Sequence, residues 1–546
     1  MKKFLPDLIA ILAFIILSFA YFFPADIEGR ILFQHDTAAG VGAGQESKEY
    51  LERTGERTRW TNSIFGGMPT YQMSPSYDST TSLKGVEKVY RLFLPDYVVL
   101  TFIMMLGFYI LLRAFGISAW LAGLGGVIWA FSSYFFILIP AGHIWKFVTL
   151  AYIPPTIAGV VLAYRKKYLL GGIVTALFIA LQIQSNHIQM SYYFMFVILF
   201  FVGAYFEDAY KKKELPHFFK ASGVLALAAV VGVCINISNL YHTYEYSKET
   251  MRGKSELKQE GAAASQTSSG LDRDYITNWS YGIGETLTLL VPNVKGGGSG
   301  STMSQSEAAM AKANPMYNGI YSQLPQYFGE QPWTAGPVYV GAFVMFLFVL
   351  GCFIVKGPLK WALLGATIFS ILLSWGKNFV GLTDFFIDYV PMYNKFRAVS
   401  SILVIAEFTI PLLAIFALKE ILSKPDMLKQ EKNCRGVIAA LVLTAGVALI
   451  LAVAPGTFFS SFITTQEMTA LKQALPAEHL APFVANLTEM REAIIASDAW
   501  RSFFIIVIGC LFLFLYQLRK LKASFTLAGI ALLCLIDMWS VNKRYL

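Results

Sequence analysis

One carboxylate, Asp36, lies in a polar segment where it could act on a bound molecule. It follows Phe23, the end of the first apolar run, by thirteen residues. A carboxylate there can take a proton from a hydroxyl group, and a Gly-Gly-Met-Pro turn at 66–69 would let backbone approach a substrate closely. The alternative is a solvated Asp that caps a short helix, which on residue type alone is the more common case.

Cationic and imidazole side chains stand at the ends of other apolar runs. His143 and Lys146 open one run, His187 connects two more, and Lys395 and Arg397 enter a fourth. Ionisable groups are costly at such positions, and phosphate is the natural partner of Lys and Arg. The alternatives are that the cations reach lipid headgroups, and that the histidines only form hydrogen bonds within the polar ends of the helices. These five residues are candidates for binding a substrate or its phosphate.

Further candidates lie in two long polar stretches. Trp60 precedes the glycine turn, and Arg252 and Lys254 form a basic segment that could contact an anion or an acceptor, although a charged loop is usually just solvated. No GxxxxGK[ST], HExxH, GxSxG or CxxC pattern occurs, so ATP hydrolysis and the common metallo- and serine-hydrolase sites have no basis. A divalent ion is compatible with the site, but no second outer carboxylate is placed to share it, so we assign no metal ligand and no cofactor.

The elements that position these residues are membrane helices. The chain has 546 residues, of which 55% are hydrophobic and 14% charged, and its mean hydropathy is +0.53. A soluble domain carries roughly a quarter charged residues, so the composition predicts an all-α polytopic membrane protein. Five cysteines in apolar runs or a short basic loop give no disulfide framework. Thirteen apolar runs are predicted to span: 7–23, 97–112, 117–139, 144–164, 168–183, 188–205, 218–237, 337–355, 359–375, 398–418, 436–453, 500–518 and 523–538.

The distribution of Lys and Arg predicts the orientation. With the N-terminus inside, the inner segments hold twenty of these residues and the four short outer loops hold seven, which favours this orientation. Because the predicted number of spans is odd, the C-terminus is then outside. The net charge of +9 then reflects topology and not a nucleic-acid partner. The whole chain, 1–546, is predicted to be one transmembrane domain with two large outer loops, 24–96 and 241–336. In the second loop, 275–292 and 326–333 have the aromatic content of an ordered surface.

A short aromatic segment, 379–391, is too short and too acidic to span. It is predicted to be an interfacial helix near the lipid headgroups, where a lipid substrate would enter, with simple packing against the bundle as the more common alternative.

Together these residues resemble the YfhO-type family of bacterial membrane proteins, and its Bacteroidetes-like branch in particular. The resemblance covers nearly the whole chain. It rests on Asp36 followed by WTNSIFGGMPTYQ, and on GHIWKFVTLAYIPP, SNHIQMSYY, RGKSEL, YITNWSYG, YFGEQPWTAGPVYVGA, VPMYNKFRAVS and DMWSVNKRYL.

The resemblance implies a GT-C-like fold and an inverting glycosyltransferase. Such enzymes take a sugar from a polyprenyl-phosphate carrier at the outer face of the bacterial cytoplasmic membrane and use a carboxylate in the first outer loop. Asp36 is then the expected catalytic residue, and His143, His187 and Arg397 are expected site residues. The expected partners are the lipid-linked donor, membrane lipids, and a cell-envelope glycopolymer, lipid or protein as acceptor.

Two departures from the family matter. Its longer members continue into an extracytoplasmic domain after the last span, whereas this sequence ends at Leu546, so a deleted or separate domain could hold acceptor specificity. His35 stands where relatives commonly have a small polar residue, so we give it no catalytic role. A lipid or polysaccharide transporter and a non-catalytic envelope-assembly scaffold remain the alternative functions. The spans hold few midplane polar residues beyond Gln182, Asn236 and Glu407, which is weak support for transport.

Overall fold

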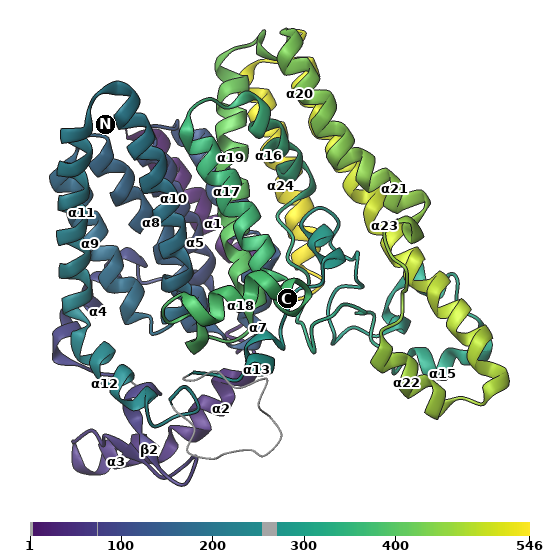
Figure 1. Cartoon of the computed structure of the whole chain (residues 1–546), viewed down its shortest axis with the longest axis horizontal. Coiled ribbons are helices and arrows are strands. Elements are labelled where there is room, and N and C mark those ends of the chain that lie inside the picture. Colours follow the sequence, from purple (N-terminus) through teal and green to yellow (C-terminus); the bar gives the residue numbers. More distant parts are fainter. Residues whose placement is uncertain (1–3, 74, 254–269) are drawn as a thin grey trace. The chain divides into compact units, whose positions relative to one another are not determined.

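The computed structural model describes residues 4–73, 75–253 and 270–546. It is 73% helical with almost no sheet, as the sequence predicts. The chain forms two compact units, and each is described by itself (Figure 1). The first unit comprises Met1–Ala130, Leu138–Arg273 and Val390–Phe396, and the second comprises Phe131–Ile137, Asp274–Tyr389 and Arg397–Leu546.

The first unit is built around one almost entirely buried helix, α8 (Ile144–Tyr164). Its neighbours include α5, α9, α10 and α11. Gly159 on α8 and Gly171 on α9 allow these two helices to cross closely, because a Cβ on Gly171 would lie 2.7 Å from the carbonyl oxygen of Gly159. The apolar helices of this unit are α1 (Leu5–Phe22), α5 (Asp96–Ala114), α6 (Ala119–Ala130), α9 (Tyr168–Gln184), α10 (Ile188–Lys212) and α11 (Leu215–Ile235).

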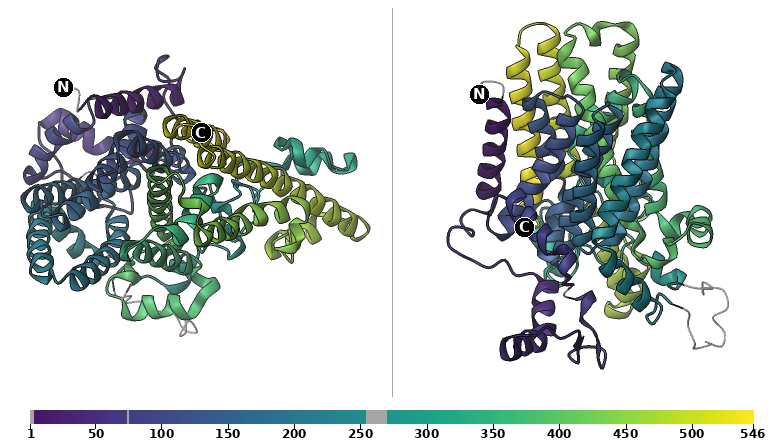
Figure 2. Two further views of the ribbon diagram at one scale, coloured as in Figure 1. Left: turned by 90° about the horizontal axis from the view of Figure 1, so that it is seen from above. Right: turned by 90° about the vertical axis from the view of Figure 1, so that its left-hand side faces the viewer.

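The first long loop forms a small structure at one end of these helices (Figures 1 and 2). Its two short strands pair antiparallel, Trp60 opposite Pro69 and Thr61 opposite Met68. The polar elements of the unit are α2 (His35–Ala43), α3 (Gln45–Thr54), β1 (Trp60–Thr61), β2 (Met68–Pro69), η1 (Thr70–Gln72), α4 (Asp78–Tyr90), α12 (Ile237–Ser247) and η6 (Tyr393–Lys395).

The second unit is built around α19 (Val404–Ser423), which is buried between α16 and α17. The other long helix, α23 (Ala477–Gln517), begins 23 residues before the predicted span at Trp500, and its first half packs on the second long loop. The other helices of seven or more residues in this unit are α16 (Ala342–Ile354), α17 (Pro358–Ser374), α18 (Val380–Tyr389), α20 (Glu431–Leu441), α21 (Val447–Val453), α22 (Thr465–Ala474) and α24 (Ala523–Asn542). The first residues of α7 (Ser133–Ala141) also belong to this unit.

Short helical turns connect these elements. They are α13 (Arg273–Thr277), η2 (Gly284–Leu289), η3 (Met303–Gln305), α14 (Glu307–Met310), η4 (Pro315–Tyr317), α15 (Asn318–Tyr321), η5 (Gly376–Phe379), η7 (Val399–Leu403), η8 (Met427–Lys429), the π-turn η9 (Val442–Gly446) and η10 (Pro455–Thr457).

Every predicted apolar run contains helix, and the fold is that of a multi-pass membrane protein. Within the described part of the chain, nine helices are long and apolar enough to cross a membrane, or up to eleven if each of two bent helix pairs counts as one span. The two remaining runs form the shorter apolar helices α9 and α16, of 17 and 13 residues. The count of thirteen spans and the orientation stay predictions.

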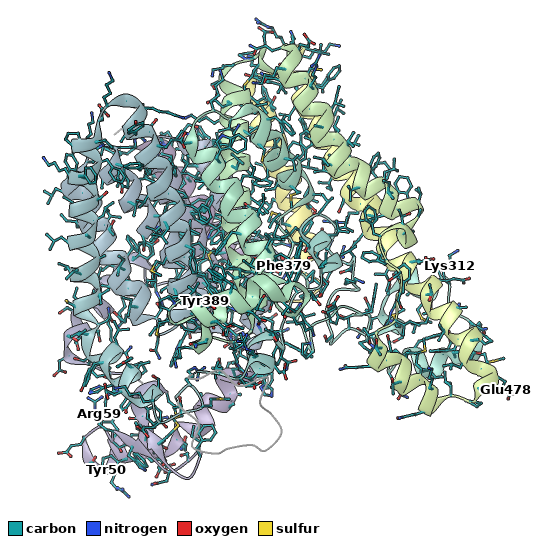
Figure 3. All side chains as sticks on the ribbon, viewed as in Figure 1. Tyr50, Arg59, Lys312, Phe379, Tyr389 and Glu478 are labelled. Atoms are coloured by element: carbon teal, nitrogen blue, oxygen red, sulfur yellow. The ribbon has the colours of Figure 1, made fainter. Side chains whose placement is uncertain are left out.

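The aromatic segment 379–391 forms α18, and the α17–α18 pair bends by 109°. Phe379 and Tyr389 are exposed (Figure 3). Phe385 is also exposed, whereas Phe386 and Ile387 are buried. The segment therefore contains a separate short helix that exposes Phe385 and Tyr389 together with Asp388, and its position at a membrane interface stays a prediction.

Candidate functional site

The first turn of α2 is docked on the turn that follows α7. Helix α7 ends at Ala141, and Gly142 adopts a φ of +83°, with its N–H and that of the next residue bonded back to Ile139 and Leu138 in a Schellman motif. The side-chain amide of Gln34, just before α2, donates to the carbonyl oxygen of Ile139 at 2.9 Å. Two residues later Asp36 lies in the first turn of the helix.

The docking brings Asp36 to His143. Nε2 of His143 lies 3.1 Å from Oδ2 of Asp36, and both side chains remain about half exposed, at 47% and 56%. A hydrogen bond from an imidazole fixes the orientation of a carboxylate without hiding its second oxygen from a ligand. His35 points its Nδ1 toward the other oxygen of Asp36 at 3.7 Å, but its side chain is 84% exposed. The arrangement leaves an oriented, accessible carboxylate.

Lys146 and His187 lie beside this pair. Lys146, in the first turn of α8, is only 8% exposed. His187 is held in the turn before α10, where Asn186 adopts a φ of +60° and accepts a hydrogen bond from Asn239 at 3.1 Å. Nδ1 of His187 is shielded from solvent and has no hydrogen-bond partner among the described residues. A buried polar atom of this kind is available to a ligand.

The charge state of His187 follows from its surroundings. Burial in the first place, and then the charges of Lys146 and His143, lower its pKa from 6.5 to about 3. His187 is therefore a neutral imidazole near neutral pH, next to a cation.

This low pKa predicts how stability depends on pH. The unfolded chain protonates His187 near pH 6.5, but the folded protein does so only near pH 3, so its full stability is present above pH 6.5 and is lost as the pH falls toward 3. Between pH 6.5 and 4, His187 makes the free energy of unfolding fall by up to about 1.4 kcal/mol per pH unit. We expect His187→Gln to remove this contribution, so that the thermal unfolding midpoint falls less steeply with decreasing pH. His35→Gln removes an exposed imidazole from the same unit and should leave the wild-type slope; an unchanged slope in His187→Gln would contradict the prediction.

Lys395 and Arg252 form a separate contact in the first unit. Nζ of Lys395 donates to the carbonyl oxygen of Arg252 at 2.7 Å, and Nε of Arg252 donates to that of Lys395 at 3.0 Å. Burial lowers the pKa of Lys395. The same segment is fastened to the start of α10, where the hydroxyl of Tyr192 donates to Pro391 at 2.8 Å. The segment that carries Lys395 is therefore attached to α10, the helix that His187 precedes.

The other predicted residues lie elsewhere. Arg397 belongs to the second unit, where NH1 donates to the hydroxyl of Tyr275 at 2.5 Å and the guanidinium covers the ring of that tyrosine. Trp60 packs on Gly67, whose added Cβ would lie 2.7 Å from the indole. Lys254 lies outside the described residues.

Two residues of the first unit were missed by sequence reasoning. Glu46 accepts hydrogen bonds from the backbone and side chain of Asn62 and from the hydroxyls of Thr61 and Ser63, at 2.8 to 3.2 Å. These bonds, first that from the Asn62 backbone, lower the pKa of Glu46 to about 2. The other is Gly142, whose only sequence signal is a glycine just before His143.

Gly142 offers a test of the docking that does not depend on activity. A Cβ at this position would lie 3.0 Å from the backbone nitrogen of Thr37 and from Cβ of Asp36, so α2 must shift. We expect Gly142→Ala to speed amide hydrogen exchange in residues 35–43 about tenfold, which is the effect of losing ~1.4 kcal/mol of local stability. Gly29→Ala is the matched control, because Gly29 also has a positive φ of +64° but open space around it. Equal exchange in the two variants would show that Gly142 does not hold α2 in place.

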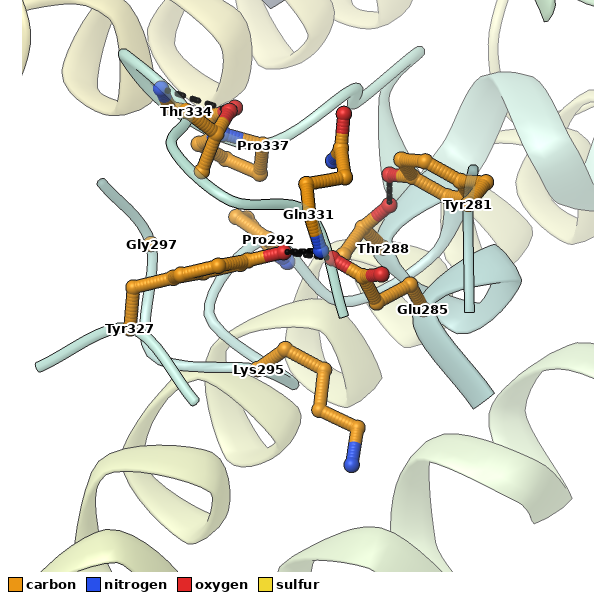
Figure 4. Close-up of a pocket in the computed structure, with 11 residues that line it drawn as sticks. Tyr281, Glu285, Thr288, Pro292, Lys295, Gly297, Tyr327, Gln331, Thr334 and Pro337 are labelled. Carbon is orange, nitrogen blue, oxygen red and sulfur yellow. Dashed lines mark hydrogen bonds between the residues drawn. The ribbon is translucent and has the colours of Figure 1, made fainter. Parts of the chain in front are cut away.

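The second long loop contains a different polar cluster, centred on Glu285 (Figure 4). Glu285 is 2% exposed and accepts hydrogen bonds from the Tyr327 hydroxyl at 2.5 Å and the Gly282 N–H at 2.7 Å. The Nζ atom of Lys295 lies over the ring of Phe459, and burial raises the pKa of Glu285 and lowers that of Lys295. The space between these groups is large enough for only about one water molecule. The cluster therefore joins the two ordered segments of the loop and is too small for a substrate.

Across residues 4–73, 75–253 and 270–546, no three His, Cys, Asp or Glu side chains are grouped so as to hold a metal ion.

The long apolar helices define this chain as an all-α, multi-pass membrane protein. Compared with protein-family models, curated proteins and solved structures, the chain matches none.

Proposed function

We propose that this chain is a glycosyltransferase that moves a sugar from a polyprenyl-phosphate carrier to a cell-envelope acceptor at the outer face of the bacterial cytoplasmic membrane. The resemblance to the YfhO-type family motivates the proposal. The observation that carries it is the exposed Asp36 carboxylate, oriented by His143 at 3.1 Å at one end of a bundle of apolar helices. Lys146 and neutral His187 adjoin this pair.

The proposed reaction is a single displacement. The acceptor oxygen forms a bond to the anomeric carbon of the sugar, and the bond from that carbon to the carrier phosphate breaks. Asp36 takes the proton of the acceptor hydroxyl, while the second Asp36 oxygen stays bonded to His143. Attack from the side opposite the leaving phosphate inverts the sugar carbon, as in GT-C-like enzymes.

The departing phosphate needs positive charge and no other activation. Lys146 is largely buried, and a cation in such a place binds an anion more strongly than an exposed one does. Lys395 and Arg252, in the same unit, are further candidates for the phosphate or the acceptor. His187 stays neutral, so its unpartnered Nδ1 can take a hydrogen bond from a sugar hydroxyl.

The test is a transfer assay with the full chain purified and reconstituted into liposomes. Labelled hexose and N-acetylhexosamine on polyprenyl phosphate are the donors, envelope polymer fractions are the acceptors, and released polyprenyl phosphate is the readout. We expect transfer from at least one lipid-linked donor and none from the matching nucleotide sugars. Movement of intact donor across the bilayer without transfer would support the transporter instead, and neither activity would support a scaffold.

A further inference from the structure

A pocket lies at the opposite end of the same helices from Asp36. It contains about 730 Å³ of space, including the part open to solvent, between the last turns of α8 and α10 and the first turn of α11. Lys146 lies at the start of α8 and the pocket at its end, so the length of this 21-residue helix separates them. In the same way, His187 precedes α10 and the pocket lies at the end of that helix. At 1.5 Å per residue this distance is about 30 Å, the thickness of a membrane core. The pocket is therefore independent of the proposed transfer site.

Basic side chains dominate the polar lining of this pocket. Arg165, Lys166 and Lys212 face two carboxylates, Asp208 and Glu214. Lys166 pairs with Glu214 at 2.9 Å and Lys212 with Asp208 at 2.6 Å, and the lysine side chains are 59% and 60% exposed. Such exposed ion pairs stabilise a fold little, so an incoming anion can replace the carboxylates as partner of the lysines.

Arg165 supplies the fixed part of the site. One of its guanidinium nitrogens donates to the carbonyl oxygen of Ala114 at 2.6 Å, which caps the end of α5 and holds the side chain in one direction. A guanidinium held in this way presents its remaining donors in a planar fork that suits phosphate oxygens.

The other wall of the pocket is aromatic and continues onto an exposed aromatic surface. The rings of Tyr164 and Tyr205 stack at 4.4 Å, and Phe218 stacks on Tyr164 at 5.5 Å. Beside them, Tyr210 and Phe219 are exposed, at 65% and 62%. A soluble anion needs no such apolar rim, whereas the upper acyl chain and glycerol of a lipid would pack on it.

We propose that this pocket binds the phosphate group of an anionic phospholipid, with Arg165, Lys166 and Lys212 as the phosphate ligands. Basic pockets between membrane helices on the cytoplasmic side are typical sites for such headgroups, and the basic turns here are the ones predicted to face inside. The inference goes beyond the proposed transfer activity and does not depend on it.

The test is native mass spectrometry of the full chain in detergent, titrated with phosphatidylglycerol and, separately, with phosphatidylethanolamine of the same acyl chains. We expect phosphatidylglycerol to bind more tightly, and Lys166→Gln and Lys212→Gln each to weaken it about fivefold. Lys211→Gln is the matched control, because Lys211 also forms an ion pair four residues back, with Glu207, but does not line the pocket. We expect it to bind phosphatidylglycerol as the wild type does.

Each contrary result overturns the proposal. Equal affinity for the two lipids would exclude an anion-selective site, and equal loss in Lys212→Gln and Lys211→Gln would show general surface charge and no pocket. Glycerol phosphate without acyl chains is the last arm: if it competes as well as the lipid, the site takes a soluble phosphate ester.

Discussion

Asp36→Asn is expected to lower the rate of sugar transfer from a polyprenyl-phosphate donor by about three orders of magnitude. Asn keeps the shape of the side chain and a hydrogen bond to His143, but it cannot accept the proton of the acceptor hydroxyl, and general-base catalysis contributes 10²–10⁴ in rate. Because the Asp36 side chain is 56% exposed, the fold should be unaffected. The measurement is the initial rate of polyprenyl phosphate release in liposomes, with the thermal unfolding midpoint alongside.

The matched control is Asp78→Asn. Asp78 is also exposed, and it also lies in the first turn of a helix in the first long loop. We expect its substitution to leave transfer at the wild-type rate. Retained transfer in Asp36→Asn would remove this carboxylate from the mechanism, and equal loss in both variants would point to the charge of the loop as the cause.

Arg491→Met is expected to have the largest effect on stability. Arg491 is 0% exposed, and both its terminal nitrogens donate to Glu467 at 2.7 Å. One of them also donates to the Phe462 carbonyl oxygen at 2.6 Å, and the other to that of Pro325 at 3.2 Å. Removing one partner of a buried ion pair costs about 3–5 kcal/mol, because the other charge is left without compensation.

The loss of stability should be largest in the part of the second unit that surrounds Arg491. Its neighbours form a buried cluster that joins the second long loop to α22 and the start of α23: Met303, Ala309, Tyr317, Tyr321, Leu471, Phe483, Leu487, Met490 and Ile494. We expect limited proteolysis of Arg491→Met to cut within 303–325 and 463–475 under conditions that leave the wild type intact. Arg435→Met is the control, because its ion pair with Glu431 is fully at the surface, with side chains 78% and 81% exposed. Equal resistance of Arg491→Met and wild type would contradict a structural role for this arginine.

The interior of the apolar runs was predictable, but their breaks were not. The run 117–139 is one stretch in the sequence, yet it forms α6 and α7 with a bend of 47° between them. In the second unit, Ser132 at this break donates to Glu407 at 2.5 Å, and the N–H of Ser133 donates to the carbonyl oxygen of Tyr339 at 3.1 Å. The partners are more than 200 residues away, so no local pattern could reveal the break.

Arg491 shows the same limit for charged residues. In the sequence it counts as one of seven cations in short outer loops, with nothing to distinguish it from Lys472. The structure buries Arg491 against Glu467, while Lys472 lies on the exposed surface of α22. Burial of a charge depends on whether a distant carboxylate and carbonyl oxygens meet it, and spacing along the chain does not report this.

For the candidate site, too, some features could be predicted from the sequence and others could not. The amino-acid pattern was enough to predict an all-α membrane protein, because an apolar run in lipid can satisfy its backbone hydrogen bonds only within a helix, and this requirement is local. It also marked Asp36, His143, Lys146 and His187 as polar groups at the ends of such runs. The contact between Asp36 and His143, 107 residues further along the chain, became visible only in the folded protein, where the space beside Gly142 lets the two segments approach closely. Helices follow from the chemistry of each segment, whereas a site follows from distances between segments, and folding alone sets those distances.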